Sequence, residues 1–219
     1  MDVEFWTQKW QTGQIGFHLP HPNPLLLRYW SAVAPAAPVT LVPMCGKSLD
    51  LNWLADQGRA VIGIELDRRA VEQFFDEQGV QVQPQACGAH QRYRAPKLEI
   101  LQGDFFTVQP SQLPECNAFY DRAALIALPA EMRQAYIEQL AALLPVGASG
   151  LLITLEYPQA QKAGPPFSLT QEALLALCQG RFELTLLSRE DVLAEPENAR
   201  FVAQGVTWLN EAVYRLRRL

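Results

Sequence analysis

The stretch VTLVPMCGKSLDLNWLADQGRAVIGIE, residues 39–65, decides the fold. It begins and ends with short apolar runs, at 39–43 and 60–64, which predict strands buried on both faces. Between these runs, apolar residues at helical spacing follow Ser48, a good N-cap, and stop before Gly58. A strand, a helix and a second strand in this order predict two parallel strands joined by a crossover helix.

The same alternation continues along the chain. Asp67 predicts the N-cap of a second helix that ends at Gly79, and Pro129 predicts the start of another helix. Three further apolar runs predict strands at residues 98–101, 118–120 and 150–156. Because buried strands alternate with amphipathic helices, the sequence predicts a doubly wound, mostly parallel α/β sheet of the Rossmann-like kind.

Three segments depart from this alternation. Residues 81–96 are polar, and we expect an irregular insertion there. Residues 182–188 and 206–216 alternate more evenly between apolar and polar types, which predicts antiparallel strands that close one edge of the sheet. The sheet core is therefore predicted to span 38–219, preceded by an amino-terminal extension or lid over 1–37.

Composition limits the class of protein. The 219 residues carry a formal net charge of −5, which argues against a general nucleic-acid binder, because such proteins carry a basic face. No stretch approaches the roughly 20 apolar residues that span a membrane, and the amino terminus lacks the apolar run of an export signal. The four cysteines are widely spaced, which indicates free thiols. We therefore expect a single domain over residues 1–219 that acts on small molecules as a cytoplasmic monomer.

Folds of this class bind ligands at the carboxyl ends of their parallel strands. The first strand leads into a turn with Gly46, which lets the backbone approach a ligand closely. Glu65 ends the second strand, at about the 20-residue interval where an acid meets ribose hydroxyls; the alternative is a solvated strand-end glutamate. The turn lacks the glycines of a P-loop or of a dinucleotide fold, which favours S-adenosylmethionine, a nucleoside without phosphate.

Two further strand ends carry candidate ligand residues. Asp104 and Phe105 follow the third strand, where an acid and an aromatic ring suit an adenine; the alternative is a turn aspartate followed by core phenylalanines. Arg122 follows the fourth strand beside Asp121. This pair predicts either an arginine that holds an anionic substrate, fixed by the aspartate, or a surface ion pair.

The amino terminus carries aromatic residues at helical spacing. Trp6 and Trp10 lie four residues apart and share one face of a predicted helix, and Phe17 and His18 follow in a glycine-containing loop. Such a stripe usually packs in a core, but this one precedes the sheet, which suits a lid over a bound ligand. His18 and His21 are too few ligands for a metal site, so no metal is expected.

Several stretches are typical of one known family. They are FWTQKW (5–10), GFH (16–18), LVPMCGKSLDLNWLADQG (41–58), VIGIELDRRAVEQFF (61–75), GDFF (103–106), YDRAALIALP (120–129) and EYPQAQKAGPPFS (156–168). In these stretches, which cover nearly the whole chain, the sequence resembles the thiopurine S-methyltransferase family, and its bacterial branch in particular. The order PMCGKS, DRAAL, GPPF is far more specific than any of its parts.

The resemblance implies a class I methyltransferase fold that uses S-adenosylmethionine, releases S-adenosylhomocysteine and needs no metal. The implied cofactor contacts are Trp10, Met44, Gly46, Glu65, Asp104, Phe105 and Arg122. The implied substrate contacts are Phe17, Arg122 and Arg200, with Arg122 as the catalytic residue. Met44 stands where leucine is usual in the family, a change that keeps the contact apolar.

The resemblance also implies the reaction. The sulfur of a small aromatic or heterocyclic thiol, such as a thiopurine, attacks the methyl carbon in line, and the protein aligns the reactants and excludes water. Three alternatives remain at this point: methylation of selenium or tellurium compounds by the same site, a NAD-dependent oxidoreductase, and a non-catalytic S-adenosylmethionine sensor.

Overall fold

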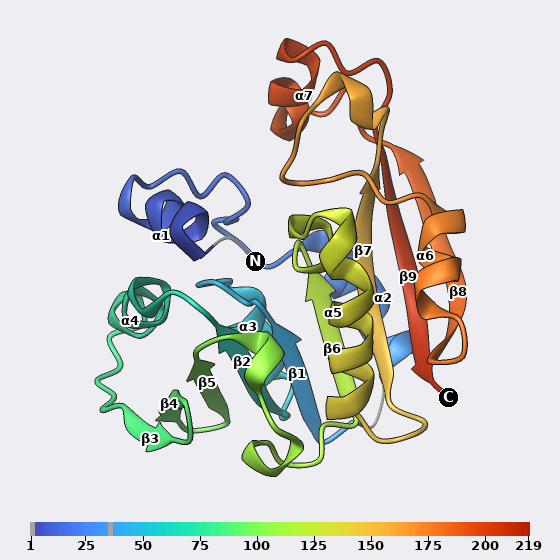
Figure 1. Ribbon diagram of the computed structural model, residues 1–219. Coiled ribbons are helices and arrows are strands. Elements are labelled where there is room, and N and C mark those ends of the chain that lie inside the picture. The colour runs from blue at the N-terminus through green and yellow to red at the C-terminus, as the bar shows by residue number, and fades with distance from the viewer. Residues whose placement is uncertain (1–2, 35–36) are drawn as a thin grey trace.

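The computed structural model describes residues 3–34 and 37–219. Its strands are β1 (Val39–Pro43), β2 (Ala60–Glu65), β3 (Gln85–Cys87), β4 (His90–Ala95), β5 (Leu98–Gln102), β6 (Ala118–Arg122), β7 (Ser149–Glu156), β8 (Phe182–Asp191) and β9 (Asn210–Arg218). Its α-helices are α1 (Val3–Gln11), α2 (Pro24–Val33), α3 (Asp50–Asp56), α4 (Arg68–Glu77), α5 (Ala130–Leu143), α6 (Gln171–Cys178) and α7 (Ala199–Ala203). The strands form one sheet in the order β3-β4-β5-β2-β1-β6-β7-β9-β8 (Figure 1).

The centre of the sheet is parallel, as predicted. Strands β5, β2, β1, β6 and β7 pair in parallel. Antiparallel strands flank this centre on both sides, with β9 and β8 beyond β7, and β4 and β3 beyond β5. The α/β fold class is therefore confirmed, and the sheet has a second antiparallel edge that the sequence pattern did not indicate.

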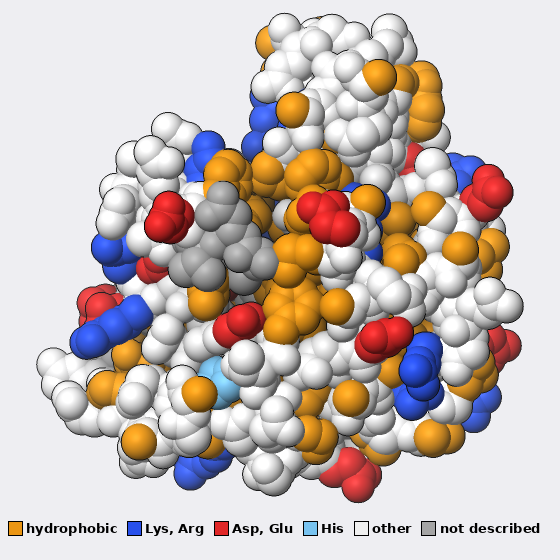
Figure 2. Space-filling model, viewed as in Figure 1, with side chains coloured by type: hydrophobic (Ala, Val, Ile, Leu, Met, Phe, Trp, Pro, Cys, Tyr) orange, Lys and Arg blue, Asp and Glu red, His pale blue; other side chains and the backbone are white. Residues whose placement is uncertain are grey.

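Helices cover both faces of the sheet. Buried side chains of α2, α3 and α4 form one hydrophobic cluster with residues of the sheet, and those of α5 and α6 form another. In the space-filling view, hydrophobic side chains gather in the hollow between the part that carries α1 and the part that carries α7 (Figure 2).

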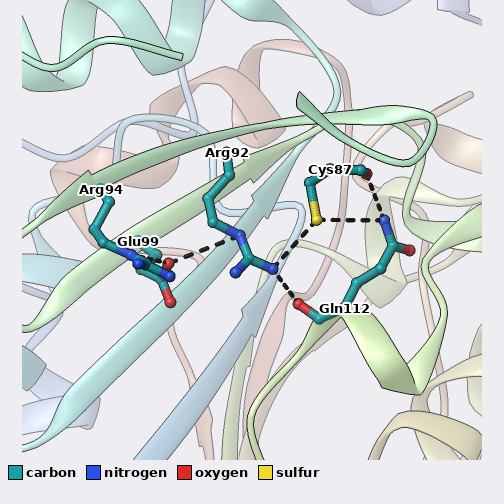
Figure 3. A network of polar contacts seen from close by, with 5 residues as sticks. All are labelled: Cys87, Arg92, Arg94, Glu99 and Gln112. Carbon is teal, nitrogen blue, oxygen red and sulfur yellow. Dashed lines mark hydrogen bonds and ion pairs between the residues drawn. The ribbon is translucent and has the colours of Figure 1, made fainter. Parts of the chain in front are cut away.

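The segment 81–96 is wrongly predicted as irregular, because it contains β3 and β4. Hydrogen bonds and ion pairs of polar side chains connect this edge to its neighbours (Figure 3). Arg94 Nε lies 2.6 Å from Glu99 Oε2 of β5, and Arg92 Nε lies 3.8 Å from the same atom. Arg92 also donates to the backbone carbonyl of Gln112. Strands at the edge of a sheet often carry polar and charged side chains, so a search for apolar runs does not find them.

Of the three predicted helix starts, those at Asp67 and Pro129 are confirmed and the one at Ser48 is wrong. Asp67 is the N-cap of α4, and its carboxylate accepts the N–H of Arg69 at 2.8 Å. Ser48 is not the N-cap of α3, because that helix begins at Asp50 after Leu49. The Ser48 hydroxyl instead accepts the Asp50 N–H at 3.2 Å, within the turn that precedes the helix.

The last two strands are displaced from their predicted bounds. β8 continues to Asp191, beyond the predicted end at 188, and β9 begins at Asn210 instead of 206. The even alternation of residue types identified both strands, but it does not define the residue at which a strand begins or ends.

The amino-terminal extension divides into two parts with different surroundings. Leu26, Trp30 and Val33 of α2 are buried in the hydrophobic cluster beneath the sheet. The start of α2 is tied to α3, because the carboxylate of Asp50 accepts the N–H of Asn23 at 2.7 Å. Helix α1, in contrast, lies beyond the ends of the central strands, on the side that carries α4 (Figure 1). Helix α1 and the loop after it are therefore placed to cover a ligand.

This division predicts unequal effects of two tryptophan substitutions. Trp30 is 1% exposed, so Trp30→Ala is expected to lower the free energy of unfolding by about 3–5 kcal/mol. Trp6 of α1 is only half-buried, so Trp6→Ala is the matched control, with an expected loss below about 1.5 kcal/mol. Urea unfolding measures both. Equal losses would contradict the assignment of α2 to the core.

Candidate active site

A cavity of about 700 Å³ opens at the carboxyl ends of the parallel strands. It is lined by α1 and the loop after it, by the turns that follow β1 and β2, and by the ends of β6 and β7. The predicted site residues that it brings together are Trp10, Phe17, Met44, Gly46, Glu65, Arg122 and Arg200. They come from six separate stretches of the chain, and only the fold makes them neighbours.

The turn after β1 is shaped by unusual backbone angles. Met44 and Gly46 both have positive φ, 47° and 55°. A Cβ at Gly46 would lie 3.2 Å from Cζ2 of Trp10, so α1 packs directly on this turn. Cys45 is turned inward, where its Sγ would lie 2.7 Å from a Cβ at Gly63. Burial raises the pKa of the Cys45 thiol well above its ordinary value, so it stays protonated and is no nucleophile.

Glu65 connects the turn after β1 with the turn after β2. Its side chain is buried, and Oε2 accepts the N–H of Gly46 at 2.7 Å while Oε1 accepts the N–H of Asp67 at 2.8 Å. Burial raises the pKa of this carboxyl to about 7, and the two backbone donors act in the opposite direction. Each carboxylate oxygen keeps acceptor capacity for one further donor, which suits a vicinal diol.

Arg122, at the end of β6, does not pair with Asp121. Consecutive residues of a strand point to opposite faces, so the prediction that Asp121 fixes Arg122 is wrong. Asp121 lies under α5, where it accepts the hydroxyl of Tyr136 at 2.7 Å, and burial raises its pKa to about 6. Arg122 lines the cavity, and its Nη1 donates to the carbonyl of Phe17 at 2.5 Å.

Two more cations lie in the cavity near Arg122. Arg200 of α7 and Lys162, in the loop after β7, stand 5.5 and 5.4 Å from the ring centre of Phe201. The pKa of Lys162 is lowered by burial and by Arg200, and the pKa of Arg200 is lowered by burial and by Arg122. In the described part of the chain none of the three pairs with a carboxylate, so this end of the cavity favours an anion.

Contacts between aromatic rings hold the amino-terminal segment over the cavity. Phe17 contacts Trp6 and Trp10 edge to face, with ring centres 5.8 and 5.7 Å apart. Trp10 is 6% exposed, and both Trp10 and Phe17 line the cavity. With the hydrogen bond from Arg122 to Phe17, these contacts place α1 as a cover over the turn after β1.

Asp104 and Phe105 are not among the residues that line the cavity. Phe105 is 2% exposed and packs on Tyr136, with ring centres 4.9 Å apart. Asp104 caps a short 3₁₀ helix and accepts the N–H of Phe106 at 3.1 Å. These contacts fit the alternative of a turn aspartate before core phenylalanines, and the assignment of both residues to the adenine stays a prediction. A strand-end position alone does not determine which way a ring points.

Some residues that line the cavity were not predicted as site residues from the sequence. His18 was noted only as a poor metal ligand, yet it lines the cavity, and its pKa is lowered mainly by burial and then by Lys47. Lys162 and Glu211 also line the cavity. Glu211 begins an antiparallel strand, so a search of the carboxyl ends of parallel strands does not find it.

Within residues 3–34 and 37–219, no group of three or more His, Cys, Asp or Glu side chains is arranged to hold a metal ion. The same described residues include no helix of sufficient length and apolarity to cross a membrane.

The raised pKa of Glu65 predicts a pH dependence of stability. Its pKa is about 7 in the folded protein against an ordinary 4.5, so the folded state holds the proton more tightly. The stability that this group contributes is complete below pH 4.5 and is lost as the pH rises from 4.5 to about 7. Glu65→Gln is expected to reduce the loss of unfolding free energy between pH 5 and pH 8 by about 2–3 kcal/mol.

Urea unfolding of the ligand-free protein at the two pH values measures this difference. A constant penalty from the new amide is the same at both values and cancels. Glu138→Gln, at an exposed position of α5, is the control and leaves the difference unchanged. The same slope in Glu65→Gln and in the unsubstituted protein would mean that Glu65 titrates normally.

The chain is similar to known proteins over its whole length. The family model described as thiopurine S-methyltransferase matches residues 1–219. Proteins named thiopurine S-methyltransferase from Pseudomonas aeruginosa (strain UCBPP-PA14) and Xanthomonas campestris pv. campestris (strain 8004) are 48% and 50% identical to the chain. Both matches run over 219 residues and cover 100% of each protein.

Solved structures share the fold at low sequence identity. The 1,6-didemethyltoxoflavin-N1-methyltransferase of Burkholderia thailandensis, solved with S-adenosylhomocysteine, matches with a TM-score of 0.63 and 13% identity, over 99% of this chain and 86% of that one. The N-methyltransferase NodS of Bradyrhizobium japonicum WM9 matches with a TM-score of 0.62 and 12% identity, over 96% of this chain and 98% of that one. The full-length match to the family model and the identity to its relatives show that the chain belongs to the thiopurine S-methyltransferase family, a family of S-adenosylmethionine-dependent enzymes.

Proposed function

We propose that this enzyme methylates the sulfur of small aromatic or heterocyclic thiols, thiopurines among them. The observation that carries the proposal is the set of three cations, Arg122, Lys162 and Arg200, that have no carboxylate partner in the described residues. A thiolate is the reactive form of a thiol, and nearby positive charge favours it over the neutral thiol. The cations therefore suit an acceptor whose sulfur carries the negative charge.

The opposite part of the cavity suits the methyl donor. Glu65 offers two carboxylate oxygens that each hold one backbone N–H and can accept one ribose hydroxyl. Gly46 has no side chain, which lets Trp10 pack on the turn after β1 and cover this part of the cavity. When bound, S-adenosylmethionine supplies a methyl group already activated by a sulfonium sulfur.

The protein's own residues then align the reactants and keep water out. Arg122 lines the cavity at the end of β6, where it can hold the acceptor sulfur as an anion. Trp10 and Phe17 cover the cavity with apolar surface, which strengthens electrostatic interactions beneath them. No covalent intermediate is needed, in keeping with the buried, protonated state of Cys45.

The same cations also suit small oxyanions or anionic compounds of selenium and tellurium, which are the alternative acceptors. Family membership favours methyl transfer over the nicotinamide chemistry considered from the sequence.

We further propose a cytoplasmic monomer that acts on small molecules and not on nucleic acid. Its four free cysteines suit a reducing compartment, and its net charge of −5 disfavours a phosphate backbone.

Two substitutions are expected to separate cofactor binding from acceptor turnover. Glu65→Ala removes two ribose contacts and is expected to weaken the binding of S-adenosylhomocysteine by about 10–100-fold. Arg200→Met removes a cation at the acceptor end, so it is expected to lower kcat/KM for thiophenol by about 10-fold or more with cofactor affinity nearly unchanged. Calorimetry and a methyl-transfer assay measure the two quantities.

The controls distinguish the alternatives. Titration with NAD is expected to give no heat, and binding of NAD alone would favour an oxidoreductase. Binding of S-adenosylhomocysteine without turnover of any thiol, selenium or tellurium acceptor would favour a sensor. Turnover of the oxyanions but of no thiol would replace the proposed acceptor class with the alternative one.

A further inference from the structure

An acidic side chain lies in the cavity and has no part in the function proposed above. Glu211 is the second residue of β9, is half-buried and lines the cavity. β9 is antiparallel to β7, so it starts at the edge of the sheet where β7 ends. Glu211 pairs with Leu155 of β7, two positions from Ile153, which pairs with Arg122. Paired residues and alternate residues share a face, so Glu211 and Arg122 project from the same side of the sheet.

The carboxylate of Glu211 has no hydrogen bond or ion pair to any other residue of the described chain. Two neighbouring acids, Glu156 and Glu190, have partners. Glu156, at the end of β7, accepts Arg189 Nη2 at 2.7 Å and the hydroxyl of Tyr214 at 3.3 Å. Glu190 of β8 pairs with Arg28 at 3.5 Å. The acceptor capacity of Glu211 is therefore free for a ligand.

The charges around Glu211 favour a group that takes up a proton. Arg122 faces it from β6, Glu190 from β8 and Glu195 from the loop after β8. Burial raises the pKa of Glu211, the charge of Arg122 opposes this rise, and the two glutamates add to it. A carboxylate with a raised pKa is a better base than an exposed one.

We propose that Glu211 accepts the ring N–H of heterocyclic thiones, the acceptors in which N–H is bonded to the carbon of C=S, and takes up that proton during methyl transfer. This inference rests on the proposed function, and it adds Glu211 as the proton acceptor and the thione as the reacting tautomer. Arg122 and Glu211 project from the same face of the sheet. They would then hold adjacent atoms of the acceptor, with the sulfur toward Arg122 and the N–H toward Glu211.

The step balances without any further reactant. The acceptor sulfur forms a bond to the methyl carbon as the bond from that carbon to the sulfonium sulfur breaks, with its electron pair going to the departing sulfur. The C=S bond becomes C–S, the adjacent C–N bond becomes C=N, and the N–H proton passes to the Glu211 carboxylate. Without a proton acceptor the methylated ring would carry a positive charge among three cations, so removal of the proton lowers the barrier.

The test compares two acceptors of similar size. Pyridine-2-thione has a ring N–H beside C=S, whereas thiophenol has none. Glu211→Gln keeps the shape and can accept a hydrogen bond but cannot take up the proton. It is expected to lower the ratio of kcat/KM for pyridine-2-thione to that for thiophenol by about tenfold or more. Glu211→Ala, a second variant, is expected to lower the ratio at least as far.

Glu183→Gln is the control, because it removes an exposed acid of β8 that does not line the cavity, and it leaves the ratio within about twofold. The affinity for S-adenosylhomocysteine checks that each variant is folded. An unchanged ratio in both Glu211 variants would overturn the inference while thiophenol turnover upholds the proposed function. If the unsubstituted enzyme methylates neither acceptor, the proposed function fails, and the inference fails with it.

Discussion

The buried carboxylate of Glu65 is the contact on which the geometry of the site depends. It accepts one backbone N–H from the turn after β1 and one from the turn after β2, so it fixes two ligand-facing turns relative to each other. Gly46 provides one of these donors and also the surface on which Trp10 packs. The cover formed by α1 is therefore built on the turn that Glu65 holds in place.

The charge distribution divides the cavity into two parts. Glu65 supplies acceptors where the nucleoside is expected, and Arg122, Lys162 and Arg200 supply positive charge where the acceptor is expected. Unpaired charges in a partly buried cavity cost free energy in the empty protein, because burial and then mutual repulsion lower the pKa of Lys162 and Arg200. Such a cost is typical of sites that are organised for binding.

The sequence predicted the parts of the structure that follow from local patterns. The strands β1 and β2, the cap at Asp67 and the position of Glu65 follow from hydrophobic runs and spacing. Local patterns do not give the direction in which a side chain points. Phe105 follows a strand as a ligand contact would, yet it points into the core. Glu211 starts an antiparallel strand, and only the register of β7 with β9 brings it beside the parallel strand ends.

The structure of the protein crystallised with S-adenosylhomocysteine is the most direct test of the central claim that Glu65 and Gly46 form the cofactor part of one cavity. The account predicts both ribose hydroxyls within about 3 Å of the Glu65 carboxylate oxygens, under Trp10, with the sulfur directed toward Arg122. A ribose bound elsewhere, with Glu65 still bonded only to the two backbone N–H groups, would contradict it.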